Sequence, residues 1–124
     1  MADLETRITD AIRSVQTGVC WRPGSAERHL QKRKLRGHLP AEATLEDYER
    51  VIQTVAQEHE TAVYVYWHSG IPYVTLTAVI EDRCWLVMFD LDGLIESAFV
   101  VERPDRYLSN PAFVRSGTVG EVQL

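Results

Sequence analysis

The feature that most constrains the fold is a change in the hydrophobic period at Thr61. From there to residue 101 the helical period gives way to short apolar runs with the alternation of strands, in which successive side chains point to opposite faces. The run over residues 84–89 is almost uniformly apolar instead, as in a central strand covered on both faces. Turn residues divide this region into predicted strands over residues 61–67, 71–80, 84–89 and 94–101. Strands that follow one another through short turns predict a four-stranded antiparallel meander.

Before residue 61 the apolar spacing is helical instead. It predicts helices over residues 3–16, from a cap at Ser25 to a terminator at Gly37, and from a cap at Thr44 to about residue 59. Tyr48 falls on the apolar stripe of the last of these and is expected in the core. Helices followed by strands predict an α+β domain, with the N-terminal helices packed on the four-stranded antiparallel meander sheet.

Length and composition favour one folded domain over residues 1–124, with its core at about residues 3–108. Residues 109–124 show little periodicity and are expected to be a loosely ordered tail. No apolar run approaches the ~20 residues of a membrane span, and the N-terminus does not resemble a secretion signal, so we expect a cytoplasmic protein without a membrane partner. Cys20 and Cys84 lack the spacing of a zinc or redox motif, so no metal or cofactor is expected.

The charged residues are distributed unevenly. Residues 28–39 contain Arg28, Lys32, Arg33, Lys34 and Arg36 and no carboxylate, in a chain of formal net charge -5. Such a cluster binds an anion when it lies on one face of the fold, whereas the alternative is an ordinary solvated helix face.

Two histidines, His29 and His38, lie in the same stretch and favour phosphate chemistry, which needs a proton carrier as well as positive charge. On a helix, Lys32, Arg33 and Arg36 follow His29 at three, four and seven residues and share one stripe with it. The leucines of this segment provide too little apolar surface to bury it deeply, so its polar face is expected to remain available.

Two segments resemble the small RNase and toxin superfamily that groups barnase, EndoU, bacteriocin tRNases and RelE-like toxins. One is the helical segment Glu27-Arg28-His29-Leu30-Gln31-Lys32-Arg33, which precedes the sheet. The other is the last hairpin, Trp85 to Phe99, in which an apolar strand, an Asp-Gly turn and a Ser-Ala-Phe strand follow one another, as in phage and contact-toxin branches of the group.

The resemblance implies a metal-independent endoribonuclease that cleaves RNA, tRNA included, by attack of the 2'-hydroxyl on the adjacent phosphate. Such a reaction needs a base, an acid and cations around the phosphate. By position, the resemblance makes His29 the general acid or base and Ser97 a contact to the phosphate. Arg103, together with Lys32 or Arg28, would supply the cations. The further substrate-binding groups would be Arg33, Arg36, His38 and Tyr107, of which Tyr107 would contact a nucleobase or the phosphate. An inhibitor or immunity protein would be the second partner.

Alternatives remain open at this point. The same fold serves equally as a non-catalytic RNA-binding or protein-binding module, such as a phage accessory protein. A toxin-neutralising protein is a third hypothesis, with Tyr66 and Trp67 on an edge strand as anchors for a partner. His29 also has a structural interpretation, as a histidine near a helix start that bonds Glu27 or a carbonyl.

Overall fold

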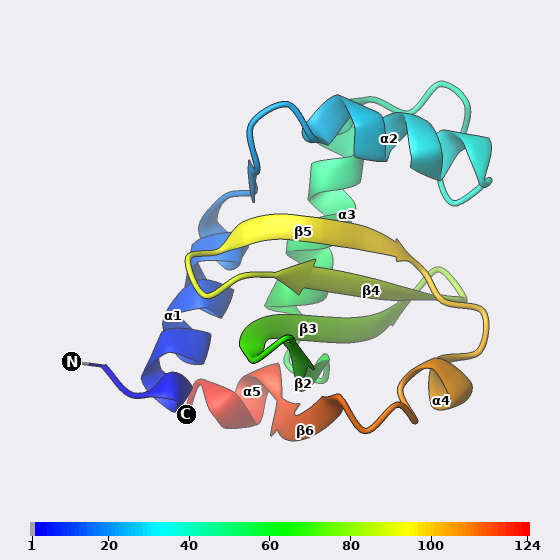
Figure 1. The fold of residues 1–124 in the computed structure, drawn as a ribbon. Coiled ribbons are helices and arrows are strands. Elements are labelled where there is room, and N and C mark those ends of the chain that lie inside the picture. Colours follow the sequence, from blue (N-terminus) through cyan, green and yellow to red (C-terminus); the bar gives the residue numbers. More distant parts are fainter. Residues whose placement is uncertain (1) are drawn as a thin grey trace.

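The computed structural model describes residues 2–124 and has an α+β fold (Figure 1). The predicted helices are present as α1 (Leu4–Thr17), α2 (Ala26–Leu35) and α3 (Leu45–Gln57), and short helices α4 (Pro104–Tyr107) and α5 (Val119–Val122) follow later in the chain. Asp3 caps α1 by accepting a hydrogen bond from the Thr6 amide at 2.8 Å. Ser25 occupies the cap position of α2, but its hydroxyl donates to the Arg22 carbonyl at 2.8 Å instead of capping the helix.

The predicted meander is present within a larger, mixed sheet. Its strands are β2 (Ala62–His68), β3 (Ile71–Ile80), β4 (Arg83–Phe89) and β5 (Leu94–Val100), paired antiparallel in chain order. The sheet has six strands rather than four, in the order β1-β5-β4-β3-β2-β6. The short β1 (Cys20–Trp21) runs parallel to β5, and β6 (Phe113–Thr118) runs antiparallel to β2.

Residues 109–124 differ most from the sequence expectation. Where a loosely ordered tail was expected, β6 pairs with β2 and α5 follows it directly. Thr118 and Glu121 form a capping box at the start of α5, and the Val119 side chain is fully buried. Because β6 covers β2, Tyr66 and Trp67 lie on an interior strand and not on the edge strand that was expected.

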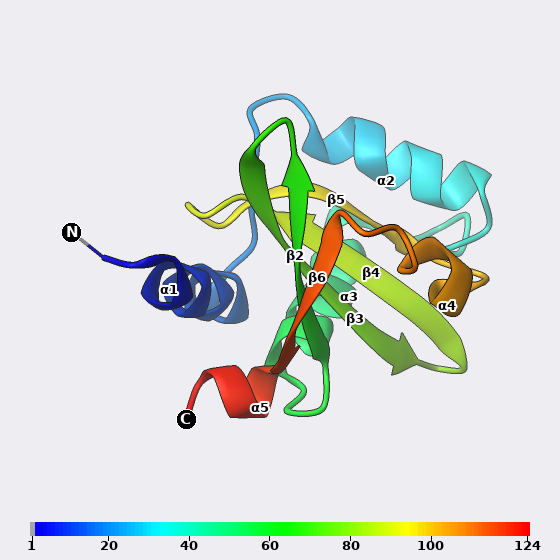
Figure 2. The ribbon, with the colours of Figure 1, turned by 60° about the horizontal axis from the view of Figure 1, so that its bottom comes forward.

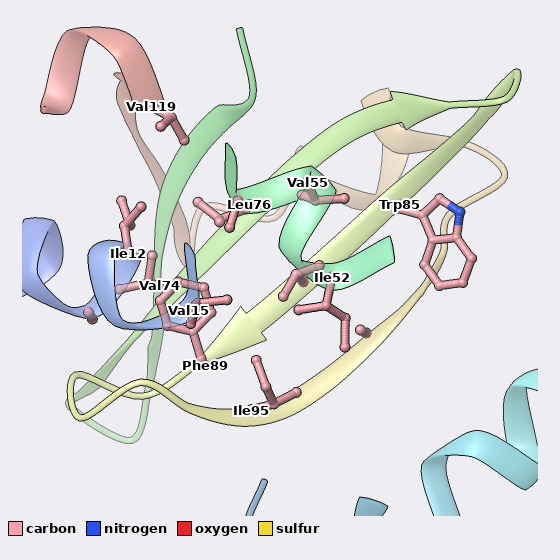
Figure 3. Packing of buried hydrophobic residues seen from close by; sticks show 14 of the residues in the cluster. Ile12, Val15, Ile52, Val55, Val74, Leu76, Trp85, Phe89, Ile95 and Val119 are labelled. Atoms are coloured by element: carbon pink, nitrogen blue, oxygen red, sulfur yellow. The ribbon is translucent and has the colours of Figure 1, made fainter. Parts of the chain in front are cut away.

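The hydrophobic core lies between one face of the sheet and helices α1 and α3 (Figure 3). Buried residues of both helices pack against alternate residues of the strands; those labelled in Figure 3 include Ile12, Val15, Ile52, Val55, Val74, Leu76, Phe89 and Ile95. Tyr48 is in this core, as predicted, and is fully buried. Its hydroxyl donates to the Ala98 carbonyl, which ties α3 to the middle of β5.

The other face of the sheet carries neither α1 nor α3. Figure 2 shows α3 behind the sheet, with α2 beyond the β5 side and α4 at one end. Alternation along β5 points Ala98 into the core and therefore points its neighbours Ser97 and Phe99 to this other face. No helix within residues 2–124 is both long enough and apolar enough to cross a membrane.

Candidate functional site

A cavity of about 790 Å³ opens between α2, the end of β5 and α4. It brings together most of the residues predicted for the site, namely Lys32, Arg33, Arg36, His38, Ser97, Arg103 and Tyr107. The first and last of these residues, Lys32 and Tyr107, are 75 positions apart in the sequence, so it is the fold that brings them together. Three members of the predicted α2 stripe, Lys32, Arg33 and Arg36, therefore border the cavity together with Ser97.

The end of α2 places Arg33 and His38 side by side. After the helix, Gly37 adopts a φ of 72°, a left-handed conformation that glycine takes without strain. The His38 amide donates to the Arg33 carbonyl at 2.9 Å and the Gly37 amide donates to the Lys34 carbonyl at 3.0 Å, which is a Schellman motif. Arg83 donates to the carbonyls of Gly37 and His38, at 2.9 and 3.2 Å, and so fastens this turn to β4.

Arg33 is the most deeply placed charge of the site. Its side chain is only 4% exposed, and its guanidinium lies 5.6 Å from the centre of the Phe99 ring. Nη1 lies 3.0 Å from Nδ1 of His38, whereas Nε is buried and has no hydrogen-bond partner among the described residues. Within residues 2–124 no carboxylate forms an ion pair with this guanidinium. Arg33 is thus a buried cation without an anion.

His38 is held in one tautomer. Its Nδ1 accepts hydrogen bonds from Arg33 Nη1 at 3.0 Å and from the Val100 amide at 3.3 Å. Both partners are donors only, so Nδ1 carries a lone pair and the proton of the neutral ring lies on Nε2. Burial, together with the charges of Arg33, Arg83 and Arg36, lowers the pKa of His38 below its ordinary value. His38 therefore presents a neutral ring with one N–H donor at Nε2.

Ser97 faces the cavity by the alternation along β5, and the strand contains an irregularity directly before it. The register of β5 against β4 shifts between Met88 and Phe89, and Glu96 is the extra residue. Glu96 is bound by Arg22, whose Nε lies 2.8 Å from the carboxylate, and it is not part of the cavity lining. The carboxylate next to Ser97 thus pairs with Arg22, which also lies 3.9 Å from Asp90, and it is outside the cavity lining.

The segment after β5 supplies the remaining wall. Arg103 directly precedes α4, and Arg106 and Tyr107 lie within it, so that the helix and its cap residue together bring three side chains to the cavity. The Tyr107 ring packs edge-on against Phe99, with the ring centres 6.0 Å apart. Burial raises the pKa of Tyr107, and Tyr66 adds to this effect, so the hydroxyl keeps its proton at neutral pH.

His29 and Arg28 do not line the cavity. His29 is half-buried and stacks on Trp21 of β1, with ring centres 5.6 Å apart. Burial first, and then the charges of Arg28, Arg33 and Lys32, lower its pKa. Along the helix axis His29 precedes Arg33 by about 6 Å, and this displacement places it at the β1 edge. His29 was expected to lie beside Ser97 and Arg103. In the structure His38 lines the cavity with these two residues instead.

Sequence reasoning missed the contributions of Phe99, Glu102 and Arg106 to the lining. Phe99 was detectable, because it follows Ser97 by two residues on the same strand face. Arg106 lies in a helix of four residues, and so short a helix has no clear signal in the sequence. Glu102 is the lining carboxylate, and its charge acts on His38 by raising that pKa, against the larger effect of the cations.

Within the part of the chain that the structure describes, no group of three or more histidine, cysteine, aspartate or glutamate side chains is arranged to hold a metal ion. Comparison of the chain with protein-family models, with curated proteins and with solved structures finds no match in any of the three.

Proposed function

We propose that this chain is a metal-independent endoribonuclease that binds the RNA backbone in the cavity between α2, β5 and α4. The observation that carries the proposal is the buried guanidinium of Arg33, which lacks a carboxylate partner within the described residues. A buried charge without a partner is costly, by several kcal/mol in typical cases. A phosphate group entering the cavity would supply the missing negative charge.

The surroundings of Arg33 favour a phosphate over other anions. Lys32, Arg36, Arg103 and Arg106 line the same cavity, so several phosphates of one backbone would find cations there. Planar guanidinium groups match phosphate oxygens in a bidentate geometry. Ser97 adds a hydroxyl donor on the cavity wall. The cluster lies in a chain with net charge -5, so the attraction is local to this site.

Cleavage by the 2'-hydroxyl needs three functions, and the cavity contains groups for each. A base removes the hydroxyl proton, and Glu102 is the lining carboxylate available for this step. Cations stabilise the charge that grows on the phosphate oxygens, which is the role of Arg33 and its neighbours. An acid protonates the departing 5'-oxygen, and the hydroxyl of Tyr107, which keeps its proton at pH 7, is the lining group for this step. The neutral ring of His38 can donate a hydrogen bond from Nε2 to a phosphate oxygen, but it does not supply the proton.

In this scheme the 2'-oxygen forms a bond to phosphorus while the bond from phosphorus to the 5'-oxygen breaks. The proton taken by the base balances the proton given to the leaving oxygen, and no other reactant is needed. The products are a 2',3'-cyclic phosphate and a 5'-hydroxyl. The resemblance of the Glu27–Arg33 and Trp85–Phe99 segments to small RNases supports the same reaction.

The test is incubation of purified protein with total tRNA and with mRNA in the presence of EDTA. Wild type should produce fragments, whereas Arg103→Ala and Glu102→Gln should lose most of the rate, by a factor of about 10² or more. Arg13→Ala is the matched control, since Arg13 is an exposed arginine on α1, paired with Asp10. RNA left intact by wild type, or cut equally by the cavity variants, would exclude the catalytic proposal for these substrates.

A second candidate function, RNA binding without cleavage, is favoured by the bonding of His38. Its Nδ1 already accepts hydrogen bonds from Arg33 and from the Val100 amide, so it cannot take a proton there without losing both. A pure binding protein would leave RNA intact and would bind it with an affinity that falls steeply as salt is added. The EDTA incubation and a salt titration together separate the two candidates.

A further inference from the structure

Aromatic rings form a continuous row that starts in the cavity and lies on the sheet face opposite α1 and α3. The row consists of Phe99 on β5, Tyr107 on α4, Phe113 on β6 and Tyr66 on β2. Successive ring centres are 6.0, 5.7 and 4.6 Å apart. The pairing of Tyr66 with Phe113 in the β2–β6 register places both on the face opposite α1 and α3. Residues from four separate elements thus build one aromatic surface, which we call the aromatic row.

The aromatic row is accessible and has cations at both ends. Tyr107 is 42% exposed, and the other rings of the row are half-buried. At the cavity end, Arg33 lies over Phe99. Beyond Tyr66, the guanidinium of Arg115 lies 5.8 Å from the centre of the Tyr64 ring on the same face. A ligand that extends from the cavity along the row therefore meets positive charge, then ring surfaces, then positive charge again.

This alternation matches one chemical class, a strand with regularly spaced phosphates and unpaired bases. Aromatic side chains bind single strands because every base has a face that can stack on a ring, whereas the bases of a duplex are already stacked on each other. We propose that the aromatic row is a base-binding surface and that the substrate is single-stranded RNA. The identity of the ligand as RNA rests on the proposed function, whereas the preference for unpaired bases rests on the row.

The first arm of the experiment measures binding of a single-stranded 2'-O-methyl oligonucleotide, which has no free 2'-hydroxyl to attack its phosphates. Stacking of one base is worth about 1–3 kcal/mol, so Tyr107→Leu should weaken binding by about 5- to 150-fold. Tyr107→Phe retains the ring and should bind within about 3-fold of wild type. Neither change removes a phosphate contact by a cation, so the slope of log affinity against log salt should stay unchanged.

The chain provides a matched control in Trp67. Trp67 is 41% exposed, nearly the same as Tyr107, but alternation along β2 places it on the face opposite Tyr66. Trp67→Leu should therefore leave binding unchanged. Arg103→Ala should act differently from Tyr107→Leu, because it should reduce the salt slope by about one phosphate contact as well as the affinity.

The second arm uses the wild-type protein alone and does not depend on the folding of any variant. The same oligonucleotide with abasic sites in place of its bases should bind at least 10-fold more weakly, and the fully paired duplex should also bind more weakly. Equal binding of the abasic strand or of the duplex would overturn the aromatic row as a base-binding surface. If Arg103→Ala still weakened binding in that case, the proposed phosphate site would stand. Absence of binding by any of these ligands would overturn both proposals.

Discussion

Replacement of Arg33 by methionine should stabilise the free protein and, at the same time, remove its affinity for phosphate. The guanidinium is 4% exposed and has no carboxylate partner within residues 2–124, so it is desolvated without compensation by an ion pair. Methionine keeps an unbranched stem of similar length that can pack against Phe99. His38 would still accept a hydrogen bond at Nδ1 from the Val100 amide.

The size of the effect follows from opposing contributions. Desolvation of a buried charge costs several kcal/mol. The substitution also removes the charged hydrogen bond to His38, worth about 1.5–3 kcal/mol, and the contact with the Phe99 ring, worth about 0.5–2 kcal/mol. We expect a net gain of about 1–2 kcal/mol in the free energy of unfolding. For a chain of this length that gain corresponds to roughly 3–10 °C in Tm.

The assay is thermal and urea unfolding, followed by circular dichroism, first in a phosphate-free buffer and then with inorganic phosphate. Phosphate at 100 times its Kd should stabilise the wild type by about 2.7 kcal/mol and the Arg33→Met variant by much less. The control is Arg36→Met, which removes an exposed cation of the same cavity. Without phosphate it should change stability by no more than about 0.5 kcal/mol.

Either of two results would refute this reasoning. One is an Arg33→Met variant that is less stable than wild type by more than about 1 kcal/mol in the phosphate-free buffer, because the guanidinium would then be satisfied within the folded chain. The other is an undiminished response of that variant to phosphate, because the anion would then bind elsewhere.

Three further predictions concern the histidines and the C-terminal segment. The pKa of His38 is lowered in the folded protein, so below about pH 6.5 the unfolded chain binds a proton at this residue that the folded chain does not. The free energy of unfolding should therefore fall as the pH drops from 7 towards 5. His38→Asn keeps a hydrogen-bond acceptor but cannot be protonated, and it should flatten this fall in urea titrations at several pH values. His29→Ala should reduce stability by about 1 kcal/mol through loss of the stack on Trp21, while RNA cleavage in EDTA should stay within about 3-fold of wild type; a loss of more than 10² would place His29 in the reaction. Val119→Ala should lower the free energy of unfolding, measured with urea, by about 1.5–3 kcal/mol because the Val119 side chain is fully buried. A change near zero would instead support the expectation of a loosely ordered tail.

The elements that sequence patterns predicted correctly are those specified by local signals. The caps at Asp3 and Thr44 and the Asp-Gly turn act over a few residues, and the structure has the helices and the last hairpin where these signals placed them. β1 and β6 had no such signal. β1 has only two residues, and β6 is an edge strand whose three central residues before Gly117 are all exposed, so neither displays a period. Both are specified by their partners β5 and β2.

Seven residues named from the sequence line the cavity, but the sequence did not reveal how they are arranged. The basic stripe of α2 was visible as a spacing, yet the rotation of a helix about its own axis is set by its apolar contacts, and α2 has few. Leu30 is buried, whereas Leu35 is 88% exposed. With so weak an apolar face, the sequence did not reveal that Arg33 would be the buried cation and that His29 would lie at the β1 edge.

The orientation of His38 could not be predicted from the sequence either. The sequence placed it after a helix terminator, where its orientation was undetermined. In the structure, the turn at Gly37 and the hydrogen bonds from Arg33 and the Val100 amide fix its ring beside the cavity. Of these contacts, the one from the Val100 amide comes from a distant part of the chain, and no local pattern could have revealed it.

The most direct test of the account is the chemistry of the RNA ends that the protein leaves. The 124-residue protein and its Arg33→Met variant are incubated in EDTA with a defined single-stranded RNA, and the termini are identified by mass spectrometry. The account predicts fragments with 2',3'-cyclic phosphate and 5'-hydroxyl ends from the wild type and intact RNA from the variant. Fragments with 5'-phosphate ends, or identical products from both proteins, would contradict it.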